Sequence, residues 1–126
     1  MAKLTKLDHG SLCVGDIDKA VWFYGDLLGL EPLPRPDFGF PGAWFDAGGT
    51  PVHLTTGGFT RSGNPELRPN DGHLAFLVDD LEEMTEELTE AGVEWWELPN
   101  SPAADRQIFF RDPWGNMIEL TRYVAA

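Results

Sequence analysis

The stretch "DHGSLCVGDI" (residues 8–17) decides the fold, because "GHLAFLVDDL" (residues 72–81) repeats its pattern later in the chain. The two stretches align without gaps, and identical or similar residues recur at a constant spacing. The matching pairs are His9 with His73, Leu12 with Phe76, Val14 with Val78 and Asp16 with Asp80. Such internal similarity indicates that the chain contains two copies of one supersecondary unit.

A second pair of stretches extends the repeat to the other end of each copy. Here "FDAGGTPVHLTT" (residues 45–56) aligns with "RDPWGNMIELTR" (residues 111–122), so a glycine-containing turn leads into an apolar strand in both. In this alignment His53 falls on Glu119. Each half therefore reads as a strand, a helix and then further strands, which predicts an α+β fold of two pseudo-symmetric modules.

The length of the chain limits its domain organisation. A chain of 126 residues with 42% hydrophobic positions can form one compact domain with its own core, but not two large ones. We expect a single domain over residues 1–126, with module 1 at residues 1–56 and module 2 at residues 72–126. The intervening residues 57–71 are rich in Gly, Pro, Asn and Arg and are predicted to be a linker.

The predicted helices have recognisable ends. Asp16 and Asp80 are placed as N-caps, and Glu83 follows Asp80 by three residues, as in a capping box. Apolar residues then recur at helical spacing until Gly29 in one half and Gly92 in the other. We therefore expect one helix in each half, ending at these glycines.

Alternation along the strands predicts which way the polar residues face. In the first strand His9 lies on the side opposite to Leu12 and Val14. His53 and Glu119 are likewise flanked by aliphatic residues that point the other way. If the aliphatic faces pack on the helices, the histidines and Glu119 face a cleft on the other side of the sheet rather than the core.

These positions predict a metal site. A single histidine is more often a hydrogen-bonded structural residue, but all three histidines of the chain, with Glu119, occupy matching places in the repeat. A pseudo-twofold arrangement would bring His9, His53, His73 and Glu119 toward one point. Three imidazoles and a carboxylate suit Zn, Ni, Co, Fe(II) or Mn, and the metal would keep Glu119 ionised when partly buried.

The composition of the chain limits the classes of partner that we expect. The formal net charge of −12 has the wrong sign for binding phosphates, so we expect no nucleic acid partner. Nine of the acids lie in residues 79–97, where a solvated helix face is the simplest interpretation. No apolar run is long enough for a membrane span, no signal peptide is visible, and Cys13 is the only cysteine. These features predict a cytoplasmic protein with no membrane partner.

Four motifs make the sequence similar to the vicinal oxygen chelate superfamily, which holds glyoxalase I, extradiol dioxygenases, and the fosfomycin and bleomycin resistance proteins. The motifs are "LDHGSLCVGDIDKAVWFYGDLLGLEP", "GAWFDAGGTPVHL", "GHLAFLVDDLEE" and "FFRDPWGNMIELTR". The resemblance implies paired βαβββ modules that form a curved, incompletely closed barrel around a divalent metal ion. It places the family's ligand positions at His9, His53, His73 and Glu119. Many members are homodimers, and some build each site from both chains.

The resemblance favours a metal-dependent enzyme of glyoxalase I type. Such a metal binds two adjacent oxygens of a small substrate, polarises a carbonyl and stabilises the enediolate that forms when a neighbouring C–H loses its proton. Glu119 is the candidate catalytic base. His53, however, stands where glyoxalase I usually carries a second carboxylate, which argues against a glutathione hemithioacetal as the substrate.

Two other functions compete with this one. An extradiol-type dioxygenase needs two histidines and one carboxylate on Fe(II) or Mn, and His9, His73 and Glu119 supply them. A bleomycin-resistance-type protein would instead sequester a cationic ligand in an acidic, aromatic cleft without a metal. Its candidate aromatic residues are Trp22, Trp44, Trp95, Trp96 and Trp114, although most of them are expected in the core or an interface.

Three arginines are weak candidates for substrate binding. Arg35, Arg106 and Arg111 can each pair with a carboxylate or phosphate through two hydrogen bonds, although a surface ion pair is the simpler expectation for each. The edges of an open curved sheet also need covering. We therefore expect a homodimer that acts on a small molecule.

Overall fold

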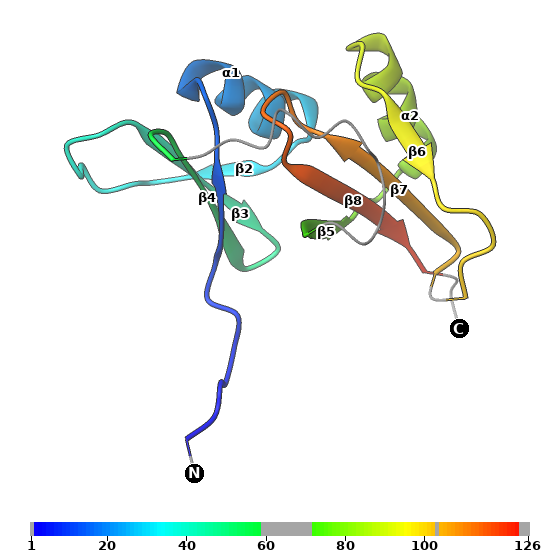
Figure 1. Ribbon diagram of the computed structural model, residues 1–126, viewed down its shortest axis with the longest axis horizontal. Coiled ribbons are helices and arrows are strands. Elements are labelled where there is room, and N and C mark those ends of the chain that lie inside the picture. The colour runs from blue at the N-terminus through cyan, green and yellow to red at the C-terminus, as the bar shows by residue number, and fades with distance from the viewer. Residues whose placement is uncertain (1, 59–71, 103, 124–126) are drawn as a thin grey trace. The chain divides into compact units, whose positions relative to one another are not determined.

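The computed structural model describes residues 2–58, 72–102 and 104–123 (Figure 1). Its contacts divide the chain into two compact units, Met1–Phe59 and Thr60–Ala126. The predicted linker, residues 57–71, lies outside the described residues except for Gly57 and Gly58. The single domain over residues 1–126 stays a prediction. No helix among the described residues is both long enough and apolar enough to cross a membrane.

The first unit is a four-stranded sheet with one helical segment. Its elements are β1 (Gly10–Cys13), α1 (Ile17–Val21), the π-helix η1 (Trp22–Leu27), β2 (Glu31–Leu33), β3 (Gly42–Ala47) and β4 (Thr50–Thr55). The strands lie in the order β1-β4-β3-β2, with β1 parallel to β4 and the other neighbours antiparallel.

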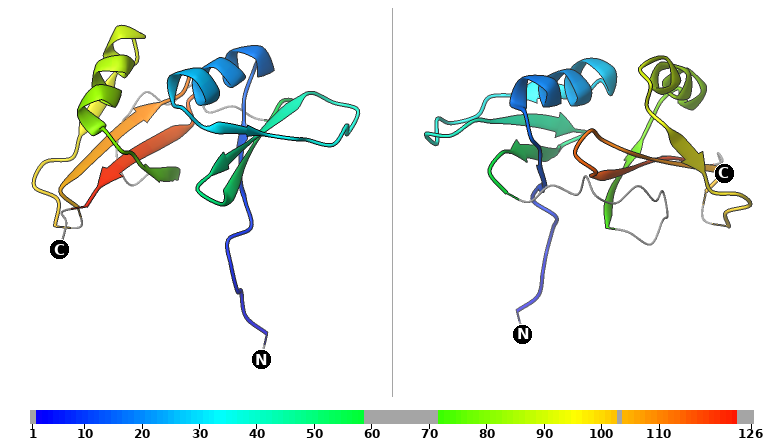
Figure 2. Two further views of the ribbon diagram at one scale, coloured as in Figure 1. Left: turned by 180° about the vertical axis from the view of Figure 1, so that it is seen from behind. Right: turned by 45° about the horizontal axis from the view of Figure 1, so that its top comes forward.

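The second unit repeats this topology. Its elements are β5 (His73–Leu77), α2 (Leu81–Glu90), β6 (Trp95–Glu97), β7 (Arg106–Arg111) and β8 (Met117–Arg122). The strands lie in the order β5-β8-β7-β6, again with the first and last strands parallel. Figure 2 shows each helical segment beside its own sheet. The predicted α+β fold with two βαβββ modules is therefore confirmed.

The strand registers are the same in the two modules. Ser11 pairs with His53 in the first sheet, and Ala75 pairs with Glu119 in the second. These two pairs occupy equivalent positions in the repeat. His9 lies two residues before Ser11, and His73 lies two residues before Ala75. Each of these histidines is therefore on the same face of its sheet as His53 or Glu119.

The helix ends follow the sequence signals. The side chains of Asp16 and Asp80 each accept a hydrogen bond from the backbone N–H three residues later, at 2.9 and 3.0 Å. Gly29 and Gly92 have φ angles of 81° and 76°, which a residue with a side chain rarely adopts. The N-caps and C-terminal stops predicted from the sequence are therefore confirmed.

The first helix is not the single regular helix that the spacing predicts. α1 continues into η1, where the Leu28 N–H bonds to the Phe23 carbonyl at 3.0 Å, five residues back. The segment between Asp16 and Gly29 is one residue longer than the matching segment of the second module. A π turn takes in the additional residue, and both Phe23 and Tyr24 are buried.

Each unit has apolar residues that are almost completely buried, and burial of each large side chain stabilises the fold by roughly 1.5–3 kcal/mol. In the first unit they are Val14, Ala20, Phe23, Tyr24, Phe45, Val52 and Leu54. In the second they are Leu81, Leu88, Ile108, Phe109, Phe110, Met117, Ile118 and Leu120. The aliphatic neighbours of His53 and Glu119 thus lie in the cores, as alternation predicts.

A network of ion pairs joins α2 to three strands of its sheet. Arg106 on β7 donates to both carboxylate oxygens of Glu97 on β6, each at 2.8 Å, and lies 3.4 Å from Glu82 on α2. Arg122 on β8 binds Glu82 at 2.8 Å and Asp105 at 2.8 Å. The other acids of α2 are exposed, except for the partly exposed Glu87, which matches the solvated face predicted from the run of acids.

Replacing Arg106 tests this network through its pH dependence. The hydrogen bonds from Arg106 hold the pKa of Glu97 below its usual value of 4.5. The folded state therefore binds fewer protons than the unfolded state, and the stabilisation is present above pH 4.5 and lost as the pH falls through the folded pKa. Because the pair is partly exposed, Arg106→Gln should lower Tm by only about 1–4 °C at pH 7.

Thermal melting of wild type and variant between pH 7 and pH 3 measures the effect. The difference in Tm should shrink below pH 4.5. Lys19→Gln is the control, because it removes the same charge and Lys19 has no ion pair among the described residues. A difference that is equally large at both ends of the pH range would mean that Arg106 acts through packing instead.

Candidate functional site

In the second module Glu119 on β8 contacts His73 on β5. The Nε2 atom of His73 lies 3.0 Å from Oε1 of Glu119, and because an ionised carboxylate only accepts hydrogen bonds, Nε2 donates. The side chain of Gln107 on β7 donates to the other oxygen, Oε2, also at 3.0 Å. Phe109, the register partner of Glu119, packs its ring edge-on to His73 with the centroids 5.5 Å apart.

Glu119 is buried more deeply than the sequence predicts. Its relative exposure is 6%, and its strand neighbours Met117 and Thr121 on the same face are also buried. Glu119 faces away from Ile118 and Leu120, as expected, but this face of β8 is covered rather than open. No Lys or Arg pairs with Glu119 among the described residues. A buried carboxylate with only an imidazole and an amide beside it is suited to a bound cation.

Gln107 is a site residue that the sequence analysis missed. Its Oε1 accepts a hydrogen bond from the Ser101 hydroxyl, which leaves its Nε2 to face Glu119. The available signal was a polar residue in "RQIFFR" on the same strand face as Phe109. Alternation identifies such a face, but it does not say that this side chain reaches Glu119 across β8.

In the first module the equivalent residues also meet. The rings of His9 and His53 are stacked with centroids 4.1 Å apart, and Trp44 on β3 stacks on the other face of His53 at 4.1 Å. Nδ1 of His9 donates to the carboxylate of Asp8 at 2.7 Å. When His9 is neutral, its Nε2 therefore keeps the lone pair that a metal ligand needs.

The surroundings of His53 favour its neutral form. Burial is the largest cause that lowers the pKa of His53, and the neighbouring charges of His9 and Arg35 lower it further. Asp8 acts in the opposite direction. A neutral imidazole is the form that binds metal ions, so the lowered pKa agrees with the ligand role predicted for His53.

The structure thus brings the four predicted ligands together in two pairs, His9 with His53 and His73 with Glu119. Within the described residues there is no cluster of three or more His, Cys, Asp or Glu that could hold a metal ion. The second pair has metal-like spacing, because two ligand atoms bound at about 2.1 Å and at right angles to one metal lie about 3 Å apart. Each pair can supply two ligands, and a complete coordination shell needs more.

The three candidate arginines differ in their surroundings. Arg106 is occupied by Glu97 and Glu82 in the ion-pair network. Arg111 donates to the Gly115 carbonyl at 2.7 Å. Arg35 donates to the Phe40 carbonyl at 3.1 Å and has no carboxylate partner among the described residues. Arg35 therefore has the surroundings best suited to an external anion.

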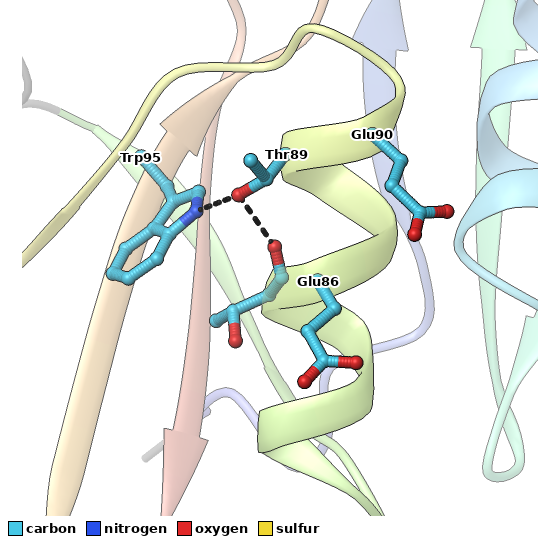
Figure 3. Close-up of a pocket in the computed structure, with 5 residues that line it drawn as sticks. Glu86, Thr89, Glu90 and Trp95 are labelled. Atoms are coloured by element: carbon cyan, nitrogen blue, oxygen red, sulfur yellow. Dashed lines mark hydrogen bonds between the residues drawn. The ribbon is translucent and has the colours of Figure 1, made fainter.

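The second module also contains a pocket between α2 and β6 (Figure 3). It is lined by Thr85, Glu86, Thr89, Glu90 and Trp95. The Thr89 hydroxyl accepts from the Trp95 indole and donates to the Thr85 carbonyl, both at 2.9 Å. The two carboxylates point away from the indole (Figure 3). The hydroxyl and indole N–H in this pocket are thus already paired, and it contains none of the predicted site residues.

The tryptophans are less buried than predicted. Trp22 and Trp96 are 43% and 37% exposed, and Trp44, Trp95 and Trp114 are partly exposed. None of the five belongs to the buried core, because smaller Phe, Leu, Ile and Val side chains fill it. The expectation was a place in the core or in an interface, and because none of the five lies in the core, a place in an interface stays a prediction.

Comparison with known proteins matches almost the whole chain to the superfamily that its four sequence motifs resemble. Residues 6–120 match the model of the Glyoxalase/Bleomycin resistance protein/Dioxygenase superfamily. The chain is 30% identical to glyoxylase I 4 of Arabidopsis thaliana, over 93% of this chain and 70% of the relative. It is 34% identical to the glutathione transferase FosA of Serratia marcescens, over 93% of this chain and 80% of the relative.

A third relative and a solved structure complete the comparison. The chain is 30% identical to the manganese-dependent 2,3-dihydroxybiphenyl 1,2-dioxygenase of Geobacillus genomosp. 3, over 94% of this chain but 37% of the relative. A crystal structure from Bacillus anthracis, assigned to the glyoxalase family, superposes with a TM-score of 0.78 at 27% identity. That match covers 98% of this chain and 99% of the other.

Proposed function

The chain belongs to the glyoxalase/bleomycin resistance protein/dioxygenase superfamily, and on this premise we propose that it is a metal-dependent enzyme of glyoxalase I type. Its substrate is a small molecule that binds the metal through two adjacent oxygens. The relatives carry the names of different enzymes, so membership alone leaves the reaction open. The choice rests on the residues around Glu119.

The buried carboxylate of Glu119 is the observation that carries the proposal. At 6% exposure it has His73 and Gln107 as partners and no Lys or Arg among the described residues. Burying a carboxylate without a counter-charge costs several kcal/mol, of the order of the whole stability of a small domain. A divalent cation bound by Glu119 and His73 offsets this cost, and it replaces the proton on Nε2 of His73.

His9, His53, His73 and Glu119 would together hold one divalent metal ion, Zn, Ni, Co, Fe(II) or Mn. The donor set fits, because the bond from Nδ1 of His9 to Asp8 leaves Nε2 of His9 for a metal and His53 favours its neutral form. When bound, the metal supplies Lewis acidity, which polarises a substrate carbonyl and makes a neighbouring C–H more acidic. A manganese-dependent relative agrees with this group of metals.

The residues around the metal then have separate roles. Glu119 is the base: its Oε2 keeps a second lone pair beside the Gln107 bond and accepts the proton from the substrate. Gln107 and Ser101 hold that oxygen in place. Trp44 and Phe109, in contact with His53 and His73, limit access of water to the imidazoles.

An extradiol-type dioxygenase is the second candidate. The 30% identity to the manganese-dependent dioxygenase supports it. In this case His9, His73 and Glu119 form the ligand triad, and His53 is a fourth ligand or an acid-base group. The cytoplasmic location expected from the sequence stays a prediction under both candidates.

Metal binding tests the proposal first. Calorimetry should show that the purified protein binds one divalent ion per chain. Its Tm should rise when Mn, Co, Ni, Zn or Fe(II) is added and fall when a chelator is added. Each metal-loaded form is then assayed with the methylglyoxal–glutathione adduct, with catechols and with aromatic antibiotics. A Tm that does not change with any of the five metals would contradict the proposal of a metal-dependent enzyme and favour a ligand-sequestering protein.

Glu119→Gln separates the base from a structural carboxylate. The variant keeps an oxygen donor and the size of the side chain but loses its charge and basicity, so metal binding should weaken moderately while turnover falls ~10²-fold or more. His53→Gln should have a milder effect, because one neutral donor replaces another. Glu90→Gln, which removes a carboxylate from the exposed face of α2, is the matched control and should behave as wild type. Wild-type turnover by Glu119→Gln would mean that another group is the base.

We also propose that the protein is a homodimer, because both sheets have edge strands and large apolar side chains are exposed. Light scattering at tens of micromolar should give twice the chain mass of 14.0 kDa. Mixing His9→Ala with Glu119→Gln, each of which should be strongly impaired alone, shows where the site lies, because activity returns only if one site uses residues of both chains. A monomeric mass would contradict the dimer but leave a site within one chain intact.

A further inference from the structure

A group of residues in the first module surrounds one arginine with aromatic rings. The guanidinium of Arg35 lies 4.8 Å from the ring centroid of Phe38 and 5.1 Å from that of Phe40. Phe38 in turn packs against Trp44 with centroids 6.0 Å apart. We call Arg35, Phe38, Phe40 and Trp44 the Arg35 cluster. Phe38 and Phe40 are each 51% exposed, which is unusual for two neighbouring phenylalanines.

The cluster lies on the sheet face that carries His53. Trp44 stacks on His53, and the charge of Arg35 is close enough to lower the pKa of His53. Gly42 lies two residues before Trp44 on β3 and so points to the same face. A Cβ at Gly42 would lie 2.6 Å from Nε of Arg35, so this position has to lack a side chain for the guanidinium to occupy its place.

The guanidinium has unused hydrogen-bonding capacity. Of its five N–H donors, one is bonded to the Phe40 carbonyl, and Nε is buried without an acceptor among the described residues. In a chain with 21 acids, Arg35 has no carboxylate partner in the part that the structure describes. Arg106 and Arg122, by contrast, each bind two carboxylates. An arginine fixed by aromatic rings and short of acceptors is suited to an oxyanion.

We propose that the Arg35 cluster binds the anionic end of an organic acid with an apolar or aromatic body. The oxyanion, a carboxylate or a phosphonate, accepts hydrogen bonds from Arg35, and the body contacts the exposed rings of Phe38 and Phe40 and the partly exposed ring of Trp44. The inference deepens the proposed function, because it makes this cluster the part of the substrate site beside His53. The substrate is then an acid that reaches the metal with its other end.

Ligand binding to chelator-treated protein tests the cluster without the metal. Benzoate and phenylphosphonate are titrated while the Nε–H signal of Arg35 and the indole N–H signal of Trp44 are followed by NMR. Both acids should shift these signals saturably. Benzyl alcohol, which lacks the charge, and inorganic phosphate, which lacks the ring, should bind at least ~10-fold more weakly.

Two variants in the cluster and one outside it decide the assignment. Arg35→Gln should weaken benzoate binding at least ~10-fold. Gly42→Ala keeps the charge but displaces the guanidinium, and it should also weaken binding. Arg122→Gln removes the same charge from an arginine that already has carboxylate partners, and it should bind benzoate as wild type does. Thermal melting confirms that each variant is folded.

The outcomes separate this inference from the proposed function. Equal benzoate binding by wild type and Arg35→Gln, or no saturable binding by wild type, overturns the anion site. Equal affinity for benzoate and benzyl alcohol does the same. Manganese binding is measured on the same samples and should be unchanged in Arg35→Gln and Gly42→Ala. Absence of manganese binding by the wild-type protein would overturn the proposed function. It would not affect the anion site, which is tested by the benzoate titration.

Discussion

The proposed function of this protein depends on one contact, that between a buried carboxylate and an imidazole. Glu119 lies inside β8 at 6% exposure, between a donor from His73 and a donor from Gln107. Hydrogen bonds to a charged group contribute about 1.5–3 kcal/mol each, so these two offset part of the several kcal/mol that burying a carboxylate costs but leave its charge without a cation. A carboxylate in this position needs neighbouring strands that hold its hydrogen-bond donors in place, and it favours the binding of a cation. The pairing of β5, β8 and β7 holds the donors, His73 and Gln107, beside Glu119.

The repeat gives the two modules the same topology and strand register but places different side chains at the equivalent positions. Because the registers match, His53 occupies in the first sheet the place that Glu119 occupies in the second. In each module that residue contacts a histidine of the neighbouring parallel strand or, for His9, of the position directly before it. The modules differ in the third partner: Trp44 stacks on His53, whereas Gln107 hydrogen-bonds to Glu119. One module therefore presents a stacked pair of imidazoles, and the other presents an imidazole hydrogen-bonded to a carboxylate.

Much of this arrangement follows from sequence spacing, and the exceptions have physical reasons. The period of two residues in a strand fixes the face of His53 and Glu119, and the helix caps fix the ends of the helical segments, so both were predictable. The π-helix was not, because it arises from one additional residue in a helical segment whose ends are unchanged. The role of Gln107 depends on the reach of a side chain across β8. The surroundings of Arg35 depend on the loop before β3, where local pattern says little about conformation.

The central proposal is that His9, His53, His73 and Glu119 bind one metal ion, and NMR of the Co(II)-loaded protein tests it most directly. Co(II) shifts the N–H signals of coordinated imidazoles far outside the normal range. We expect three such signals, each lost in one of the variants His9→Gln, His53→Gln and His73→Gln, with all three perturbed by Glu119→Gln. Shifted signals from the histidines of one module alone, or none at all, would contradict it.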